Sequence, residues 1–273
     1  MSSAENDGVN IYWDSQGSGA PLLLIMGLGW PSASWYRTRP IFNEKFRTIA
    51  FDNRGVGQSD APPGPYSIAQ MATDAAAVLK AAGVNTAHIL GVSMGGMIAQ
   101  EFALQYPQKV RSLMLGCTSA GGPEAVQPDS AAIQVLMSRG LDPEAFAEAI
   151  NPFIYDKGTP RARMDEDLRA RRKWFPTPEA YFAQLQAIIG WEGYSRLAQI
   201  RVPTVVVHGA NDRLVPPQNA NLIAQRIPGA KLVMIPHASH IFNTDHPEAA
   251  HAAFLDFLGA QATRKLERKP APV

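Results

Sequence analysis

The sequence has only one cysteine, Cys117, and almost no net charge over its 273 residues. A single cysteine excludes an intramolecular disulfide and a metal cluster held by several cysteines. The 25 lysines and arginines nearly balance the 24 aspartates and glutamates, which leaves a formal net charge of +1. Such a balance provides no overall field that would favour nucleic acid or an anionic membrane as a partner.

Long apolar runs are also missing. No run reaches the length of a membrane-spanning helix, and the polar start of the chain lacks the apolar core of a signal peptide. Neither a His-Glu-x-x-His motif nor a Gly-Lys-Ser/Thr element occurs, so no metal and no nucleotide cofactor is expected. From these absences we predict a cytoplasmic protein that works without a cofactor.

Short apolar runs alternate with helical patterns over most of the chain. The strands predicted from this alternation, the first of them as an edge strand, lie at 9–13, 21–26, 47–51, 87–91, 110–116, 203–208 and 231–235. The predicted helices between them lie at 34–43, 68–82, 94–106, 218–226 and 247–258. Apolar strands separated by helices imply an α/β fold in which a mostly parallel sheet is covered by helices on both faces.

The segment from 123 to 197 interrupts this alternation, because it has helical patterns punctuated by prolines and no strand-like run. We interpret it as a helical cap inserted between two strands of the sheet. The chain then divides into a core domain at 1–122 and 198–262, the cap at 123–197 and a basic flexible tail at 263–273.

One Gly-x-Ser-x-Gly motif stands out, from Gly91 to Gly95, with Ser93 at its centre. It lies where the strand at 87–91 should turn into the helix at 94–106. A serine in a sharp strand-to-helix turn projects its hydroxyl from the sheet, and the next backbone N–H lies at a helix N-terminus. This is the setting of an activated nucleophile. A glycine-rich turn without chemistry is the alternative that the motif alone leaves open.

A carboxylate and a histidine follow two later strands. Asp212 lies in the loop after the strand at 203–208, and His240 lies in the loop after the strand at 231–235. In a parallel sheet these loops emerge at the same edge as Ser93. The three side chains can therefore meet, in the chain order Ser, Asp, His, as a base with its orienting carboxylate requires.

The chain resembles α/β-hydrolases of the lid-bearing esterase and lactonase branch over nearly its whole length. The motifs that carry the resemblance are Gly27 to Gly29, Asp52 to Ser59, Gly91 to Gly95, His208 to Pro216 and Ala238 to His240. The resemblance implies an α/β-hydrolase fold with Ser93 as nucleophile, His240 as base and then acid, and Asp212 orienting the imidazole. It favours His240 over His237, because the base follows a small residue pair, and it treats His208 as structural.

The same resemblance implies an oxyanion hole made by two backbone N–H groups, those of Leu28 and Met94. Relatives usually have a histidine before the glycine of the first loop, whereas this sequence has Met26 before Gly27. Because the donor is a backbone N–H, the change need not affect the hole. Methionine cannot, however, brace the loop with a hydrogen bond as a histidine ring can.

Substrate specificity is expected to come from the cap and the loops beneath it. The residues that we expect to contact the substrate are Gly27, Trp30, Tyr155, Trp174 and His237. The cationic run from Arg169 to Lys173 is interpreted as a solvated helix face in preference to a carboxylate-binding site.

The implied reaction is transfer of an apolar acyl group from an ester or lactone to water, through an acyl-enzyme on Ser93. The narrower resemblance is to enol-lactone hydrolases and to environmental esterases that open N-acyl homoserine lactones. Two alternatives stay open: a cofactor-free perhydrolase or haloperoxidase with the same triad, and a ligand receptor with incidental slow hydrolysis. The expected partner is a small-molecule ester or lactone, and the sequence predicts no oligomeric state.

Overall fold

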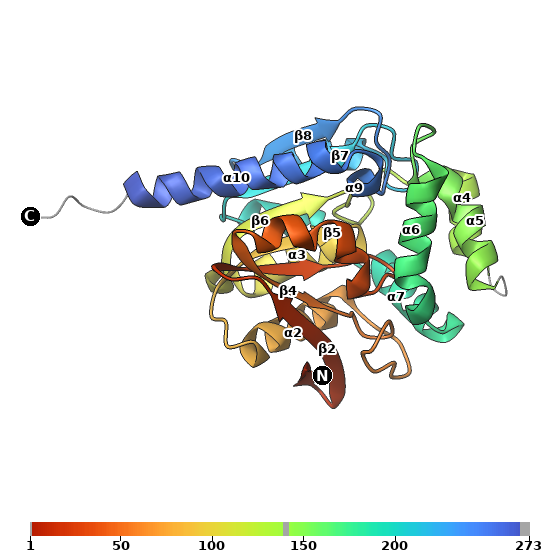
Figure 1. Cartoon of the computed structure of the whole chain (residues 1–273), viewed down its shortest axis with the longest axis horizontal. Helices are drawn as coiled ribbons and strands as arrows, with labels where there is room; N and C mark the ends of the chain where they lie inside the picture. The colour runs from red at the N-terminus through yellow and green to blue at the C-terminus, as the bar shows by residue number, and fades with distance from the viewer. Residues whose placement is uncertain (1, 139–141, 268–273) are drawn as a thin grey trace, which may run out of the picture.

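An eight-stranded sheet in the order β1-β2-β4-β3-β5-β6-β7-β8 forms the centre of the computed structural model (Figure 1), which describes residues 2–138 and 142–267. The strands are β1 Ser2–Asn6, β2 Val9–Gln16, β3 Ala20–Ile25, β4 Phe46–Phe51, β5 Ala87–Val92, β6 Val110–Gly116, β7 Thr204–Gly209 and β8 Lys231–Ile235. β2 pairs antiparallel with β1 and β4, and every other neighbouring pair is parallel. The mostly parallel sheet predicted from the sequence is confirmed.

The N-terminal hairpin corrects one expectation. The strand beginning at Val9 was predicted to be the edge of the sheet, but β1 lies outside it. Only Ala4 of β1 is buried, so the strand lacks the apolar alternation by which half-buried strands are recognised. The turn does carry a signal, because Asp7 and Gly8 have φ values of 51° and 75°, as a favoured two-residue hairpin turn requires.

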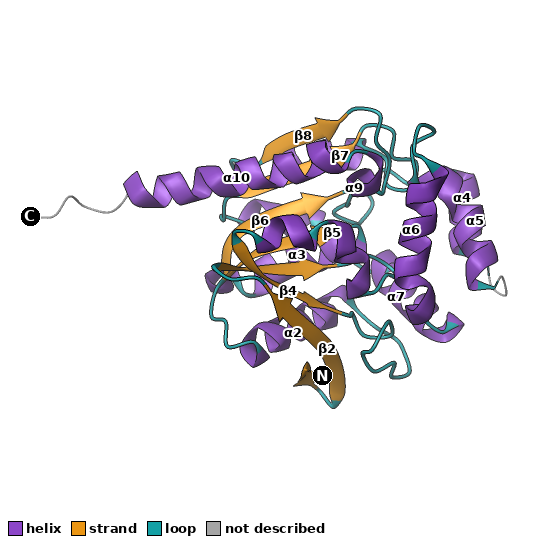
Figure 2. Cartoon of the chain, viewed as in Figure 1, coloured by secondary structure: helices purple, strands orange, loops and turns teal. Residues whose placement is uncertain are grey.

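Helices cover both faces of the sheet (Figure 2). They are α1 Arg39–Asn43, α2 Ile68–Ala81, α3 Met94–Gln105, α8 Gln218–Arg226, α9 Phe242–Asp245 and α10 Pro247–Glu267. In β3, Leu23 and Ile25 join a buried cluster with α2, α3 and α8, whereas Leu22 and Leu24 join another with α1, α9 and α10. Successive strand side chains point to opposite faces, so a strand buried on both faces is apolar throughout.

Four further helices lie beyond the carboxyl ends of the strands (Figure 1). They are α4 Ser130–Leu136, α5 Pro143–Ile154, α6 Arg161–Arg171 and α7 Pro178–Ile189. Short 3-10 helices complete the chain as η1 Ser32–Arg37, η2 Pro107–Lys109, η3 Arg172–Trp174 and η4 Tyr194–Gln199. The described residues of the segment 123–197 contain these helices and, at Glu192, one isolated bridge, but no strand.

The last helix extends further than expected. α10 runs to Glu267 and passes the boundary at 262 that the sequence suggested between core and flexible tail. The rest of that basic tail, 268–273, lies outside the described residues. In Figure 1, α10 leads away from α4–α7 toward the opposite end of the molecule. Among the described helices, none combines the length and apolar character that crossing a membrane demands.

Candidate active site

A tight turn between β5 and α3 carries Ser93. Its φ and ψ are 56° and −125°, a strained conformation that exposes a hydroxyl at the top of a sheet. The flanking glycines allow the turn, since a Cβ on Gly91 would lie 2.1 Å from the oxygen of Gly95, and one on Gly95 2.2 Å from that of Ile25. Thr118 Oγ1 donates a hydrogen bond to the Ser93 carbonyl at 2.7 Å. Close packing at the two glycines and the hydrogen bond from Thr118 therefore hold the turn in this conformation.

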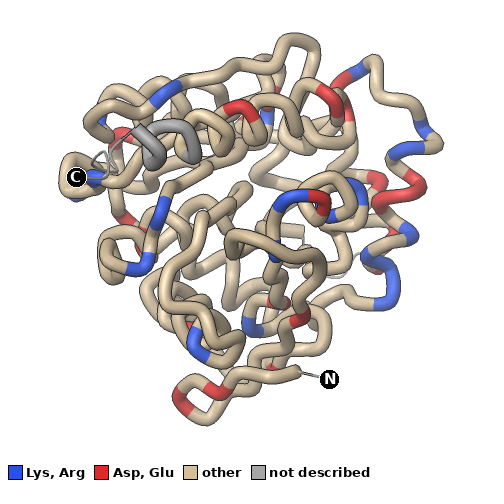
Figure 3. Tube along the Cα trace, turned by 60° about the vertical axis from the view of Figure 1, so that its left-hand side comes forward, with Lys and Arg blue, Asp and Glu red and all other residues tan. Residues whose placement is uncertain are grey.

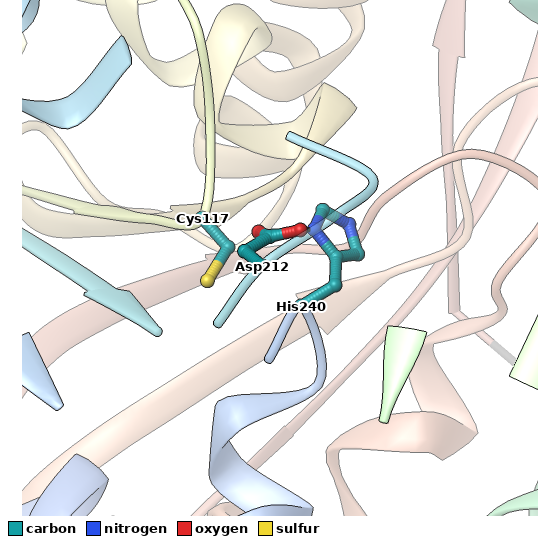
Figure 4. A group of neighbouring side chains, drawn as sticks. All are labelled: Cys117, Asp212 and His240. Atoms are coloured by element: carbon teal, nitrogen blue, oxygen red, sulfur yellow. Dashed lines mark hydrogen bonds and ion pairs between the residues drawn. The ribbon is translucent and has the colours of Figure 1, made fainter. Parts of the chain in front are cut away.

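Ser93 meets His240 and Asp212 at the carboxyl edge of the sheet. His240 follows β8, and its Nε2 lies 3.0 Å from Ser93 Oγ. Its Nδ1 lies 2.8 Å from Oδ2 of Asp212, which follows β7, and the carboxylate points at the imidazole (Figure 4). These distances suit the transfer of the serine proton to an oriented imidazole. The structure thus brings together the three residues that the sequence analysis grouped.

The carboxylate of Asp212 has no exposed surface. Its Oδ1 accepts hydrogen bonds from the backbone N–H groups of Leu214 at 2.9 Å and Val215 at 2.8 Å. Burial by itself would raise the pKa of Asp212, but the charges and hydrogen bonds of His240 and His208 lower it well below its usual range. Asp212 is therefore ionised at neutral pH and can stabilise an imidazolium.

Neither of the two competing histidines forms a hydrogen bond with Ser93 in the described part of the chain. His208 is fully buried, with Nε2 2.8 Å from the Val215 carbonyl oxygen and 3.2 Å from Asp212 Oδ2. His237 is exposed and has a φ of 54°. The structure pairs Ser93 with the histidine that the resemblance favoured, and it gives His208 a supporting contact with Asp212.

Cys117 forms a small cluster with Asp212 and His240, in which one ligand atom of each lies within 4.8 Å of the others. Figure 4 shows Cys117 and His240 on opposite sides of Asp212. The thiol contacts the Ser239 carbonyl at 3.6 Å and accepts from the Gly209 N–H at 3.4 Å, and burial raises its pKa. A neutral thiol is a poor metal ligand, and a metal would displace the bond between Asp212 and His240. The donor set favours proton transfer.

Two backbone N–H groups near Ser93 have no acceptor among the residues that the structure describes. Those of Leu28 and Met94 take part in none of the hydrogen bonds among the described residues, and both residues line the same cavity as Ser93. A Cβ on Gly27 would come within 3.0 Å of the Ser93 Cβ, so the loop after β3 passes directly beside the serine. Free backbone N–H groups beside a serine hydroxyl are the donors that an oxyanion hole requires.

Other side chains brace this loop in place of the histidine that Met26 replaces. Asn53 Nδ2 donates to the Met26 carbonyl at 2.9 Å. The Gly29 N–H donates to Gln184 Oε1, and Gln184 Nε2 donates to the Arg54 carbonyl, both at 2.8 Å. Gln184 belongs to α7, so the brace links this helix to the loops after β3 and β4. Sequence analysis missed it because a glutamine inside an apolar helix pattern carries no distinctive signal.

A cavity of about 480 Å³ opens at Ser93 and His240 and is lined in part by residues of α4, α5, α6 and α7. Gly27 and Trp30, both expected to contact the substrate, line it. Most of its other lining side chains are apolar. The cavity therefore connects the candidate nucleophile with the helical segment, as pockets that orient a small molecule do.

Three residues expected at the substrate are placed elsewhere. Tyr155 is 5% exposed, and its hydroxyl donates to Asp167 Oδ2 at 2.9 Å. Trp174 packs against Lys173, whose Nζ lies 4.6 Å from the ring centroid. Neither of them, nor the exposed His237, lines the cavity. Helical spacing predicts which face of a helix is buried, but not whether that face packs on protein or borders a cavity.

Tyr181 and Arg171 line the cavity although neither was among the residues expected to contact the substrate. Tyr181, on α7, has a buried hydroxyl without a hydrogen-bond partner in the described part of the chain, and burial raises its pKa. Arg171, on α6, belongs to the run interpreted as a solvated face, yet it is 3% exposed and lines the cavity. The neighbouring Arg172 is exposed, so that interpretation is wrong for Arg171 alone.

The chain is similar in sequence and fold to known hydrolases. The family profile described as the alpha/beta hydrolase fold matches residues 20–247. A putative carbamate hydrolase RutD from Azorhizobium caulinodans is 32% identical, over 95% of this chain and 98% of that protein. The enol-lactonase from Burkholderia xenovorans LB400 has a TM-score of 0.84 at 25% identity, covering 94% of this chain and 100% of that one. Est816, described as an N-acyl homoserine lactone degrading enzyme, has a TM-score of 0.76 at 30% identity, with coverage of 94% and 100%.

Proposed function

The chain belongs to the α/β-hydrolase fold family, and on this premise we propose that it hydrolyses carboxylic esters or lactones with apolar acyl groups. The proposal rests on two successive contacts. Ser93 Oγ lies 3.0 Å from His240 Nε2, and His240 Nδ1 lies 2.8 Å from Asp212 Oδ2. A serine hydroxyl is a weak nucleophile until a base removes its proton. In this arrangement His240 is the base, and the carboxylate of Asp212 orients it.

In the first step Ser93 Oγ attacks the carbonyl carbon of the ester while His240 Nε2 takes the hydroxyl proton. Asp212 holds the Nδ1–H and stabilises the imidazolium. The N–H groups of Leu28 and Met94 bind the charge that develops on the carbonyl oxygen. The tetrahedral intermediate then collapses, the bond to the alcohol oxygen breaks, and His240 gives its proton to the leaving alkoxide.

In the second step water attacks the acyl-enzyme, with His240 again as the base, and the acid leaves as Ser93 regains its proton. A lactone follows the same two steps, except that the alcohol stays attached to the acyl group. The similarity to the enol-lactonase and to Est816 supports lactones, N-acyl homoserine lactones among them, as substrates.

The walls of the cavity support an apolar acyl group. Four large apolar side chains that stay partly exposed also line the cavity, namely Val126, Ile133, Met137 and Ile189. An exposed lining residue lies at an opening, so the entrance is apolar as well. We therefore assign to the segment 123–197 the role of a cap that selects the acyl group.

Covalent labelling tests the proposal. A fluorophosphonate should label Ser93 stoichiometrically and abolish turnover of short 4-nitrophenyl esters. The Ser93→Ala variant should take no label and lose about a millionfold in kcat, the effect expected when a triad serine is removed. Intact-mass spectrometry and a colorimetric assay provide the two readouts.

Three further measurements separate the alternatives. If the fluorophosphonate labels Ser93 but the unlabelled protein turns over each ester only once, the protein is a ligand receptor. Peracid formation from acetate and hydrogen peroxide, faster than ester hydrolysis, would indicate a perhydrolase. An aryl carbamate belongs in the panel because one relative is named a putative carbamate hydrolase, and a carbamate preferred over all esters would contradict the proposal.

A further inference from the structure

Arg171, the last residue of α6, brings a positive charge to the wall of the cavity that Ser93 also lines. Its side chain is nearly buried, with the guanidinium carbon 4.2 Å from the centroid of the Trp30 ring and 5.5 Å from that of Phe175. Trp30 belongs to the same loop as Leu28. Stacking on aromatic rings holds a guanidinium in place while its N–H groups stay available to a ligand.

No group in the described part of the chain pairs with these N–H groups. The Arg171 side chain makes no hydrogen bond or ion pair there, and its Nε is buried without a partner. Asp167, one turn earlier on α6, acts on it electrostatically. The Asp167 carboxylate, however, accepts from the hydroxyls of Tyr36, Tyr155 and Thr244 at 2.6, 2.9 and 2.7 Å. Asp167 lines the cavity too, but its Oδ1 lies 3.6 Å from Nη2 of Arg37. The charge of Asp167 is therefore balanced by Arg37 and its oxygens are hydrogen-bonded to hydroxyls, so that Asp167 does not pair with Arg171.

The charge persists although it is unpaired. Burial lowers the pKa of Arg171, while Tyr155 and Asp167 act in the opposite direction, and a guanidinium stays protonated in proteins. The Ser34 hydroxyl and Trp35 Nε1, both on η1, also lie on the cavity wall, and they are buried without a hydrogen-bond partner among the described residues. α6 packs against η1. Buried donors without acceptors are rare. This corner of the cavity is thus suited to a ligand that supplies acceptor oxygens.

We propose that Arg171 binds a carboxylate on the part of the substrate that does not react, so that half-esters and lactones of dicarboxylic acids are the preferred substrates. This inference deepens the proposed hydrolase function and rests on it. A carboxylate matches a guanidinium in two parallel hydrogen bonds, and such bonds gain strength where water is excluded. The methylene groups between ester and carboxylate would lie along the apolar wall.

A matched pair of esters tests the inference. Mono-4-nitrophenyl glutarate ends in a carboxylate, and 4-nitrophenyl 5-methylhexanoate has an isopropyl group of the same shape in its place. The ratio of kcat/KM, carboxylate over neutral ester, should fall by about 10- to 100-fold in Arg171→Gln. Half-esters from succinate to suberate identify the chain length that spans the distance from Ser93 to Arg171. A ratio, unlike a rate, is not affected by a loss of folded protein.

Two further variants serve as controls. Arg172→Gln changes the neighbouring, exposed arginine, which pairs with Glu144, and should leave the ratio unchanged. Arg171→Lys keeps the charge but loses the paired geometry, so its ratio should lie between those of the native protein and Arg171→Gln. The result for Arg171→Lys keeps the test informative where Arg171→Gln is too unstable to assay.

Two outcomes overturn the inference: an unchanged ratio in Arg171→Gln, and an equal loss for an ester that ends in a primary amide. The second would show that Arg171 recognises a neutral oxygen. Failure of the native protein to hydrolyse either ester overturns the proposed function instead. In that case calorimetry with glutarate and with 5-methylhexanoate tests the charge site alone, and glutarate binding that does not depend on Arg171 overturns the inference.

Discussion

Two histidines contact the carboxylate of Asp212, and their hydrogen bonds place the proton on a different ring nitrogen in each. His208 Nε2 lies 2.8 Å from the carbonyl oxygen of Val215, which can only accept, so the proton of His208 is on Nε2. His240 Nδ1 donates to Asp212 at 2.8 Å, which leaves the lone pair of its Nε2 for Ser93. His208 therefore supports Asp212, and His240 is the group able to act as base.

Alanine substitutions at two histidines test this assignment. We expect His240→Ala to lower kcat for a 4-nitrophenyl ester by about a millionfold, because the serine loses its base. His237→Ala should cost less than about tenfold, since His237 is exposed and does not line the cavity. Circular dichroism of both variants controls for folding. An equal loss in the two variants would contradict the assignment of the base.

The meeting of Ser93, His240 and Asp212 could be predicted from the sequence, whereas the charge in the cavity wall could not. Ser93, Asp212 and His240 each follow a strand, and a parallel sheet gathers such residues at one edge. The position of Arg171 depends on how α6 packs against Trp30, a contact between segments far apart in the chain. A run of charged residues on a helix carries no information about which of them turns inward.

At the scale of elements, Glu101 links α3 to the end of the helical segment. It is 4% exposed and accepts hydrogen bonds from Trp191 Nε1 at 2.9 Å and from Arg196 Nη2, on η4, at 2.8 Å. Burial acts to raise the pKa of Glu101, but the hydrogen bonds of Arg196, Gln105 and Trp191 outweigh it, and the pKa is lowered. Folding therefore favours the ionised form of this carboxyl group.

The stability of Glu101→Gln should consequently depend on pH. A lowered pKa in the folded state contributes stability that is present above the unfolded value of about 4.3. This contribution to stability is lost as the pH falls through the pKa that Glu101 has in the folded state. We expect Glu101→Gln to reduce the free energy of unfolding by about 1–2 kcal/mol at pH 7, and by less at pH 3. Urea unfolding at both pH values measures the difference, and the exposed Glu44→Gln is the control. A deficit independent of pH would contradict this account.

Elements were predicted well where apolar periodicity is strong and poorly where other features decide. β6, β8 and α8 lie where the sequence placed them, because their apolar residues form the short runs or the helical spacing by which such elements are recognised. β1 is held by backbone pairing and buries only Ala4, so its pattern is polar. α10 continues to Glu267, past the last apolar repeat that the sequence analysis counted.

At the scale of the whole molecule, charged residues are dispersed, whereas the large apolar side chains that stay exposed lie mostly at the cavity. Figure 3 shows lysine and arginine interspersed with aspartate and glutamate along the chain, in keeping with a net charge of +1. Four of the five large apolar side chains exposed in the described residues border the cavity, and Ile41 is the exception. The large apolar side chains that stay exposed are thus gathered at the cavity.

Polar substitutions at the entrance should change chain-length preference. Met137 and Ile189 are 48% and 70% exposed, and both would contact the far part of a long acyl chain. We expect Met137→Gln combined with Ile189→Gln to lower the kcat/KM ratio of 4-nitrophenyl decanoate to acetate by about 3- to 10-fold. Ile41→Gln changes an exposed side chain that does not line the cavity, and it should leave the ratio unchanged. An equal decrease in all variants would mean that the entrance does not bind the acyl chain.

The direction of α10 bears on how the protein can be attached to a surface. This helix leads away from α4–α7 (Figure 1), the helices whose residues line the cavity. A chain coupled to a resin or an electrode through the end of α10 would turn its entrance toward the solution, and substrate would diffuse in freely. Coupling through α4, which lines the cavity, would instead press the entrance against the support.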